Sequence, residues 1–195
     1  MQYSFNHSII DMPNSSQRSS GKQRLIEAAA EIVSTQGVQQ LTLEGVAAAA
    51  GITKGGLIYH FKTKDDLLAA LVQSMIDEWD QRTRAKASES GSNSSAMLLA
   101  LINDTFDMQP SEKQLMRNLL AAASSYPHLL GPVRELYDRT YRDFAGSSAQ
   151  TGIALVITAA IDGISLLELL DFHHFSEDQR KAMRKALQTL AKDLT

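Results

Sequence analysis

Residues 42–67 read TLEGVAAAAGITKGGLIYHFKTKDDL, and this stretch decides the fold of the N-terminal part of the chain. Thr42 can cap a short helix, because its hydroxyl can accept the free N–H groups of the first turn. Four alanines, Ala47–Ala50, keep this helix slim, and Gly51 follows where a left-handed conformation is needed. Thr53 caps a second helix, which ends in an aromatic and basic cluster. The layout predicts a helix-turn-helix, a motif that places its second helix in the major groove of DNA.

The residues expected to contact DNA lie at the caps, along the second helix and just after it. Gly55 and Gly56 each cost about 1 kcal/mol relative to alanine inside a helix, which is explained if this helix must approach the groove closely. Polar side chains near its end supply hydrogen bonds and charge for backbone oxygens. The expected contacts are Thr42, Thr53, Lys54, Gly55, Gly56, Tyr59, His60 and Lys64. On these features alone, an ordinary helical corner remains the alternative.

The same stretch resembles the N-terminal domain of the TetR family of bacterial transcriptional repressors. The family pattern A-A-G-[IV]-[ST]-K-G appears here as residues 49–55, the aromatic-His-Phe cluster as residues 59–61, and [ST]-K-[DE]-[DE]-L as residues 63–67. The match covers about residues 20–70, and the rest of the chain agrees only in length and helical character. The resemblance implies a repressor that binds a palindromic operator as a homodimer and is released by a small-molecule effector.

The chain also departs from this pattern at named positions. The tyrosine that most members place just after the leucine is Ile58 here, and Tyr59 follows it. The resemblance therefore implies that Tyr59 is the tyrosine that contacts a phosphate. Lys62 stands where a proline is common, which removes a rigid turn and adds a possible phosphate contact.

Charge is distributed unevenly along the chain. Residues 1–64 hold 6 Lys and Arg against 4 Asp and Glu (+2), and residues 65–195 hold the remaining 13 against 18 (−5), which together give the net charge of −3. A positive head on an acidic body would orient the molecule on DNA, although an excess of two charges is weak support. Cysteine is absent, so neither disulfides nor thiolate metal sites are expected. No secretory signal pattern is apparent, so we expect a cytoplasmic protein.

The helical patterns predict an all-α fold in two domains. Residues 1–18 are polar and serine-rich and are expected to be a flexible arm. Residues 19–66 form the three-helix DNA-binding domain, and residues 67–195 form a helical domain for effector binding and dimerisation. A capping box at Thr63 begins a long helix that runs to about Lys86. We expect this helix to be the one element that touches both the head and the effector pocket, and therefore to carry the switch.

The two C-terminal helices are the candidates for dimerisation. Residues 152–172 are nearly all apolar, but the acidic residues among them argue against a membrane span. Such a helix must be buried in protein on nearly every side. Proteins of the TetR family dimerise through their last two helices as a four-helix bundle. The resemblance therefore implies a homodimer interface that includes Leu155, Ile161, Leu166, Met183, Leu187 and Leu190. The alternative is that both helices complete the core of a monomer.

The resemblance also implies an effector pocket in the body. A buried carboxylate needs partners, so Asp162 should either bond across the dimer or face this pocket. Methionine and aromatic walls would suit a flat, apolar or cationic ligand. The candidates for its lining are Met75, Trp79, Phe106, Met116, Tyr126, Tyr137, Tyr141 and Asp162, although each of them could be plain core.

Few other residues suggest chemistry. His173 and His174 are adjacent and point different ways on a helix or strand, so we predict no metal site, and no motif calls for a cofactor. No nucleophile and base are paired in the sequence, so an enzyme is not expected. The alternative function is a small-molecule carrier, or an enzyme on the helical body, whose DNA-binding head is not functional.

Overall fold

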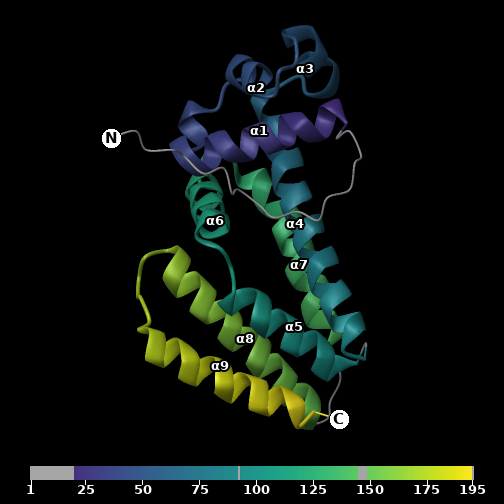
Figure 1. The fold of residues 1–195 in the computed structure, drawn as a ribbon, viewed down its shortest axis with the longest axis vertical. Coiled ribbons are helices and arrows are strands. Elements are labelled where there is room, and N and C mark those ends of the chain that lie inside the picture. Colours follow the sequence, from purple (N-terminus) through teal and green to yellow (C-terminus); the bar gives the residue numbers. More distant parts are fainter. Residues whose placement is uncertain (1–19, 92, 145–148, 195) are drawn as a thin grey trace, which may run out of the picture.

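The computed structural model describes residues 20–91, 93–144 and 149–194 (Figure 1). Within these ranges every regular element is a helix, which confirms the all-α prediction. The arm predicted for residues 1–18 lies outside the described residues.

The elements are α1 Gly21–Gln36, η1 Val38–Gln40, α2 Leu43–Ala49, α3 Lys54–His60, α4 Lys64–Glu89, α5 Ser94–Phe106, α6 Pro110–Ala122, η2 Pro127–Leu129, α7 Leu130–Asp143, α8 Ala149–Leu169 and α9 Glu177–Lys192. Figure 1 shows α1, α2 and α3 at one end of an elongated molecule and α9 at the other.

The head, formed by α1, α2 and α3, has helix ends where the sequence predicts them. The Thr42 hydroxyl accepts a hydrogen bond from the backbone N–H of Gly45 at 3.0 Å, and this caps α2. Gly51 has a φ of 62°, a left-handed conformation that glycine adopts without strain, and the chain turns there into α3. Side chains from all three helices fill the interior, and Leu25, Val46 and Leu57 have no exposed surface.

The long helix α4 joins the head to the body. Thr63 and Asp66 form the predicted capping box, with both hydrogen bonds at 3.0 Å. The apolar cluster of the head continues into the first half of α4 as far as Ile76, and it includes Leu119 of α6. Packing therefore runs continuously through residue 66, and the division into two domains there remains a prediction.

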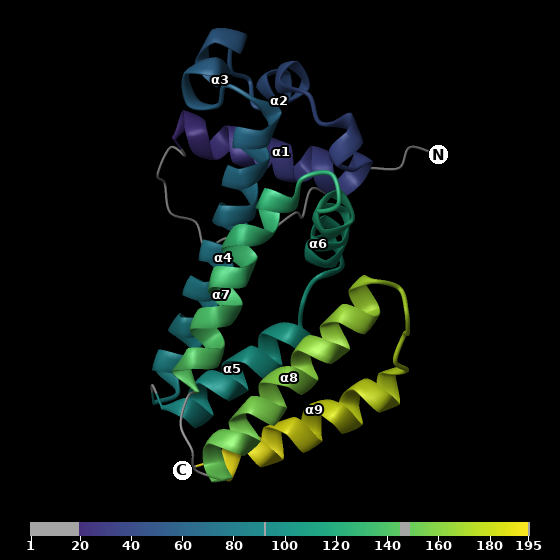
Figure 2. The same cartoon turned by 180° about the vertical axis from the view of Figure 1, so that it is seen from behind.

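Helix α6 is a second connection between head and body. Asn118 donates from Nδ2 to the carbonyl oxygens of Val33, at 2.7 Å, and of Ser34, at 3.2 Å, near the end of α1. About one turn away, Lys113 donates from Nζ to Oε2 of Glu168 on α8 at 2.8 Å. Figure 2 shows α6 between α1 and α8. Amide and ammonium groups on α6 therefore also connect the head to the body, while the expectation that the long helix is the one element touching both head and effector pocket stays a prediction.

The core of the body lies between α5, α8 and α9. Its fully buried residues include Leu98, Ile102 and Ile157. By length and composition α8 could cross a membrane, since residues Gln150–Leu169 have a mean hydropathy of 1.9, and 33% of that stretch is buried within the chain. One side of α8 packs against α5 and α9, as in the core helix of a globular domain. The remaining apolar side is exposed.

Candidate DNA-binding surface and ligand site

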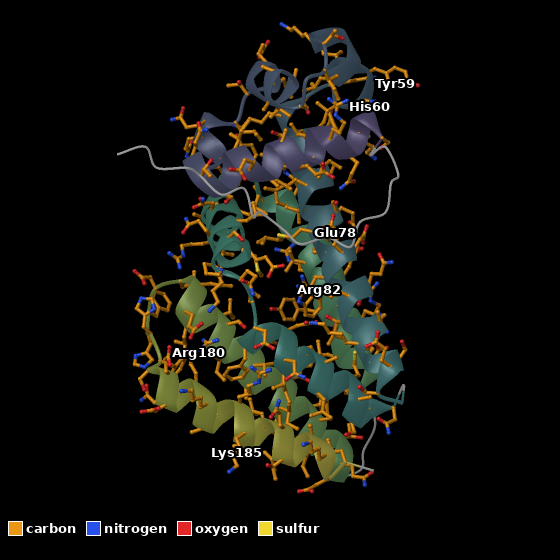
Figure 3. The ribbon with its side chains drawn as sticks, viewed as in Figure 1. Tyr59, His60, Glu78, Arg82, Arg180 and Lys185 are labelled. Carbon is orange, nitrogen blue, oxygen red and sulfur yellow. The ribbon has the colours of Figure 1, made fainter. Side chains whose placement is uncertain are left out.

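Helix α3 presents an exposed aromatic side chain from a well-anchored backbone. Leu57 is fully buried, whereas Tyr59 is 84% exposed. Figure 3 shows Tyr59 pointing away from the head at its outer end, with His60 beside it. The Tyr59 and His60 rings meet edge to face, with centroids 5.0 Å apart. The phenol hydroxyl of Tyr59 is therefore free to reach a phosphate.

The two threonines in the expected set both serve as helix caps. The Thr53 hydroxyl accepts from the N–H of Gly56 at 3.1 Å, as Thr42 does from Gly45. Both threonines are exposed. A hydroxyl that accepts a hydrogen bond keeps its own O–H to donate, so each cap can also bind a phosphate oxygen.

The two glycines of α3 differ in the space that surrounds them. A Cβ built on Gly55 would meet nothing within 4 Å, so Gly55 leaves open space on the surface. A Cβ on Gly56 would lie 2.9 Å from Cγ2 of Ile52 and 3.3 Å from the Thr53 hydroxyl. At Gly56 the packing of the turn also favours glycine, and the prediction that both glycines serve close approach to DNA stays a prediction.

Three basic side chains of the head are bonded within the chain. Lys64 donates from Nζ to the carbonyl of Val38 at 2.6 Å, so it ties η1 to the start of α4. Arg24 donates to the carbonyl of Ala50 at the end of α2, a favourable place for a cation. The periodicity of the sequence predicts neither hydrogen bond, because in each of them the donor and the acceptor lie 26 residues apart in the chain.

The third, Lys54, pairs with Glu44 of α2, with Nζ and Oε1 2.8 Å apart. In contrast, Lys22 and Lys62 are exposed and have no hydrogen bond or ion pair to another described residue. Lys62, which stands in the place of a common proline, is thus better presented for a phosphate than Lys64.

The expected lining of the effector pocket is only partly brought together. Met75 and Tyr126 pack against the cluster that continues from the head, whereas Trp79 and Phe106 pack against the body core. The side chain of Met116 on α6 is half-buried and belongs to neither set. The prediction of one pocket lined by all these residues stays a prediction, and four of the side chains pack against two different apolar clusters.

Three of the eight residues do meet, between α7 and α8. Tyr141 donates its hydroxyl to Oδ2 of Asp162 at 2.8 Å, and the Tyr137 and Tyr141 rings lie 6.5 Å apart. Burial raises the pKa of Asp162, and the hydrogen bond from Tyr141 opposes this only in part. Burial and the nearby carboxylate raise the pKa of each tyrosine to about 12, so both phenols stay protonated at neutral pH.

Two other carboxylates of the body, the buried Asp104 and the half-buried Glu168, have cationic partners. Asp104 accepts from the Thr83 hydroxyl at 2.5 Å and pairs with Lys86. Glu168 pairs with Lys113 and with Arg180. Burial would raise the pKa of Glu168, but these two cations outweigh it and lower the pKa. Among the described residues, Asp162 has no such cation.

Two small cavities lie near these carboxylates. One is lined by Lys113, Glu168 and residues of α5 and α8, and the other lies between α4 and the loop after α5, beside Asp104 and Glu112. None of the eight residues expected for the effector pocket lines either cavity.

The residues expected at the dimer interface divide between two sides of the helices. Ile161 and Leu187 are almost fully buried within the chain, and Leu155 and Met183 pack against the same core. Ile161 and Leu187 therefore have little surface left to bury against a partner, whereas Leu155 and Met183 are only half-buried, and the interface stays a prediction. Leu166 and Leu190 are exposed, each at 43%.

The exposed side of α8 is an apolar stripe. Ile153, Val156, Leu166, Leu167 and Leu170 are exposed and recur at helical spacing. Gly152 and Gly163 lie along the same stripe, with open space above them. The "apolar stripe" below means these seven residues.

The head is a helix-turn-helix whose second helix, α3, is exposed, and the body is all helical. This combination indicates a regulatory protein of the helix-turn-helix class. A family model described as "Bacterial regulatory proteins, tetR family" matches residues 25–71, and one described as "Tetracyclin repressor-like, C-terminal domain" matches residues 91–192. The chain therefore belongs to the TetR family and is a DNA-binding transcriptional regulator, which confirms the resemblance seen in its sequence.

Similar proteins agree with this assignment. The chain is 38% identical to the transcriptional regulator TtgR of Pseudomonas putida over 66 residues, which is 34% of this chain but only 31% of TtgR. It is 28% identical to the regulator BetI of Paraburkholderia phytofirmans over 186 residues, covering 90% of this chain and 94% of BetI. The solved structure of the multidrug binding protein EbrR with ethidium is similar over 88% of this chain and 98% of EbrR, with 25% identity and a TM-score of 0.64. TtgR and BetI are named as regulators, not as enzymes.

Proposed function

We propose that this chain is a cytoplasmic repressor that binds a palindromic operator as a homodimer and releases it when a small molecule binds the body. The observation that carries the proposal is the head itself. Its core is complete around Leu57, yet the helix that contains Leu57 leaves Tyr59 84% exposed. An exposed aromatic on the second helix of a helix-turn-helix is costly in water and useful against DNA. Tyr59, His60, Lys62 and the two threonine caps would anchor phosphates.

The apolar stripe of α8 supports a homodimer. A contiguous apolar surface of this kind is typical of a protein interface, and the two glycines would let a second helix approach closely. A two-fold interface pairs the same surface of both copies. Together with the exposed Leu190 of α9, the stripe would form a four-helix bundle with the partner's α8 and α9. Two heads held in this way can read half-sites one helical turn apart, roughly 34–36 Å.

We place the effector at Asp162, Tyr137 and Tyr141. Asp162 is half-buried, and a carboxylate in such a place that has only a phenol as a partner is stabilised by any cation that enters beside it. The two tyrosine rings supply faces on which a flat cation can lie. EbrR is described in complex with ethidium and with malachite green, and both are aromatic organic cations. We therefore propose an aromatic cation as the effector class.

The DNA-binding claim is tested with DNA from upstream of the chain's own gene in a gel-shift assay. We expect a specific complex that excess unrelated DNA does not compete away. Tyr59→Phe should weaken binding to all sequences alike, because it removes a phosphate contact and reads no base. A chain that binds no upstream DNA, yet binds ethidium, would instead be the small-molecule carrier that is the alternative.

The effector claim is tested by fluorescence titration with ethidium as the probe. Asp162→Asn should weaken binding about tenfold, the effect of losing one charge-assisted contact. Asp171→Asn is the matched control, because Asp171 is an exposed carboxylate near the end of α8. Since the pKa of Asp162 is raised and a cation favours the ionised form, wild-type affinity should increase as the pH rises through that pKa and then level off. Equal affinity and equal pH dependence in the Asp162 variant would refute this site.

A further inference from the structure

The larger of the two cavities of the body has a charged wall. It measures about 250 Å³ and lies between the second half of α4, the end of α5 and the start of α6. Figure 3 shows Arg82 on α4, one of the residues of this wall. Among the described residues that line the cavity, none is aromatic and none belongs to the proposed effector site. The charged ones are Arg82, Lys86, Asp104, Asp107 and Glu112.

Two cations of α4 converge on one buried carboxylate of this wall. Asp104 is 3% exposed, and its Oδ1 atom pairs with Nζ of Lys86 and lies 4.0 Å from Nε of Arg82. Arg82 also donates from Nη1 to Oε1 of Glu112 at 2.8 Å, the one hydrogen bond that it makes to a described residue. Arginine and lysine side chains have several N–H donors each. Most donors of Arg82 and Lys86 are therefore left for a ligand.

The other two carboxylates of the wall are also paired within the chain. Asp107 accepts from Nη1 and Nη2 of Arg184, at 2.6 and 2.7 Å. Glu112 accepts from Arg82 and from the backbone N–H of Gln109, the latter at 3.2 Å. A carboxylate can accept more than two hydrogen bonds, so each of them can still accept from a ligand. With two cations and three carboxylates, the lining has a net charge of −1.

This lining favours one class of ligand. A purely anionic ligand would add to the negative charge and would compete with Glu112 for Arg82. A purely cationic ligand would lie against two cations, and a large aromatic one would find no ring to stack on. The cavity is also smaller than the roughly 300–1,000 Å³ of sites for drug-sized molecules. A small molecule with a charge of each sign can instead give its carboxylate to Arg82 and Lys86, and its ammonium group to Glu112 and Asp107.

We propose that this cavity binds a small zwitterion of amino-acid size, as a second ligand site separate from the proposed effector site at Asp162. The guanidinium of Arg82 and the ammonium group of Lys86 hold the ligand's carboxylate, and Glu112 and Asp107 hold its ammonium group. Such a ligand joins α4 to the start of α6, and both helices contact the head. Its binding therefore changes operator affinity, and DNA changes its affinity by the same factor. This last step rests on the proposed binding of an operator.

The experiment is calorimetric titration of the full-length chain with the common L-amino acids, one at a time. We expect one or more of them to bind, with one molecule per chain. Acetate and methylammonium each carry only one of the two charges, so each should bind roughly tenfold more weakly than the best amino acid. That amino acid should also change the affinity for upstream DNA in an anisotropy titration.

Two variants test the wall of the cavity. Arg82→Lys keeps the charge but loses the planar group that matches a carboxylate, and Glu112→Gln loses the charge that attracts the ammonium group. Each should weaken binding of the amino acid about tenfold and leave ethidium affinity unchanged. The matched control for Arg82 is Arg84→Lys, because Arg84 is also on α4, is 41% exposed against 42% for Arg82, and does not line the cavity.

The matched control for Glu112 is Glu177→Gln, which removes an exposed carboxylate of α9 that pairs with Lys181 at 3.6 Å. Neither control should change the binding of the amino acid. Circular dichroism of all four variants shows whether each of them is folded.

The outcomes are distinguishable. If no amino acid binds, or if acetate binds as tightly as the best of them, the inference is overturned, and ethidium and operator binding still decide the proposed function. If binding of the amino acid is lost in Asp162→Asn and kept in Arg82→Lys, the ligand occupies the proposed effector site, which also overturns the inference. A chain that binds an amino acid in this cavity, but neither ethidium nor upstream DNA, contradicts the proposed function alone.

Discussion

The two ends of the molecule expose chemically different surfaces around equally complete cores. At the head, α3 presents a phenol, an imidazole and an ammonium group, while Leu57 is buried beneath them. At the other end, α8 exposes Val156 and other aliphatic side chains, while Ile157 is buried next to it. A polar surface with positive charge suits a hydrated polyanion, and an aliphatic surface suits another aliphatic surface. The difference indicates that the ends bind different classes of partner.

The largest expected effect comes from substituting arginine at two adjacent residues that lie on opposite sides of α8. Ile157→Arg places an unpaired charge in the body core and should cost more than about 4 kcal/mol of unfolding free energy, enough to unfold the body. Val156→Arg changes a side chain that is 65% exposed, so it should leave the fold intact and give monomers. Circular dichroism and light scattering measure the two results.

These monomers should also lose operator affinity, because one head has too few contacts. Folded dimers of Val156→Arg with normal DNA binding would move the interface away from the apolar stripe. Monomers from Val156→Arg that are also unfolded would mean that this face of α8 belongs to the core.

Removing the ion pairs between α6, α8 and α9 should have an intermediate effect on the unfolding free energy. Glu168→Gln leaves Lys113 and Arg180 without their shared carboxylate and should cost about 2 kcal/mol of unfolding free energy, somewhat less than for a fully buried pair. Folding lowers the pKa of Glu168, so its contribution is present above the ordinary value of 4.5 and is lost as the pH falls through the lowered value. Urea unfolding at several pH values should therefore show the wild type and the variant converging in acid. Glu177→Gln, in an exposed pair, should change stability little at any pH.

The head and α8 also differ in what their sequences reveal. In the head, Thr42, Gly51 and Thr53 fix the helix ends within a few residues, so the exposed side of α3 follows from local rules. In α8 the residues are apolar all round, and the covered side is decided by α5 and α9, which are distant in the chain. Periodicity therefore predicted a buried helix but could not choose between Val156 and Ile157.

Long-range hydrogen bonds were the second feature that local rules could not supply. Lys64 looked like a phosphate ligand, because it follows an aromatic cluster and is basic. Lys64 donates to the carbonyl of Val38, and this carbonyl comes within reach of Lys64 only when α1 and α4 pack together. The contact between Asn118 and the end of α1 has the same origin, and for this reason the link through α6 was not predicted.

The smallest expected effect separates two lysines of the head. Lys62→Ala should reduce the slope of log affinity against log salt by about 0.9, the value for one phosphate contact. Lys64→Ala should cost about 1 kcal/mol of unfolding free energy, because it removes a hydrogen bond to the backbone. Its effect on the salt slope should be smaller than that of Lys62→Ala. Salt titrations of operator binding and thermal unfolding of both variants measure this, and a larger salt effect for Lys64 would restore it as the phosphate ligand.

The most direct test of the central claim is the stoichiometry of operator binding, with and without a cation. Fluorescence anisotropy of labelled upstream DNA, combined with light scattering of the complex, measures affinity and composition together. The account predicts two chains on one palindromic site, and release of the DNA when ethidium is added to the wild type but not to Asp162→Asn at the same concentration. One chain per site, or DNA that stays bound at ethidium concentrations that saturate the protein, would contradict it.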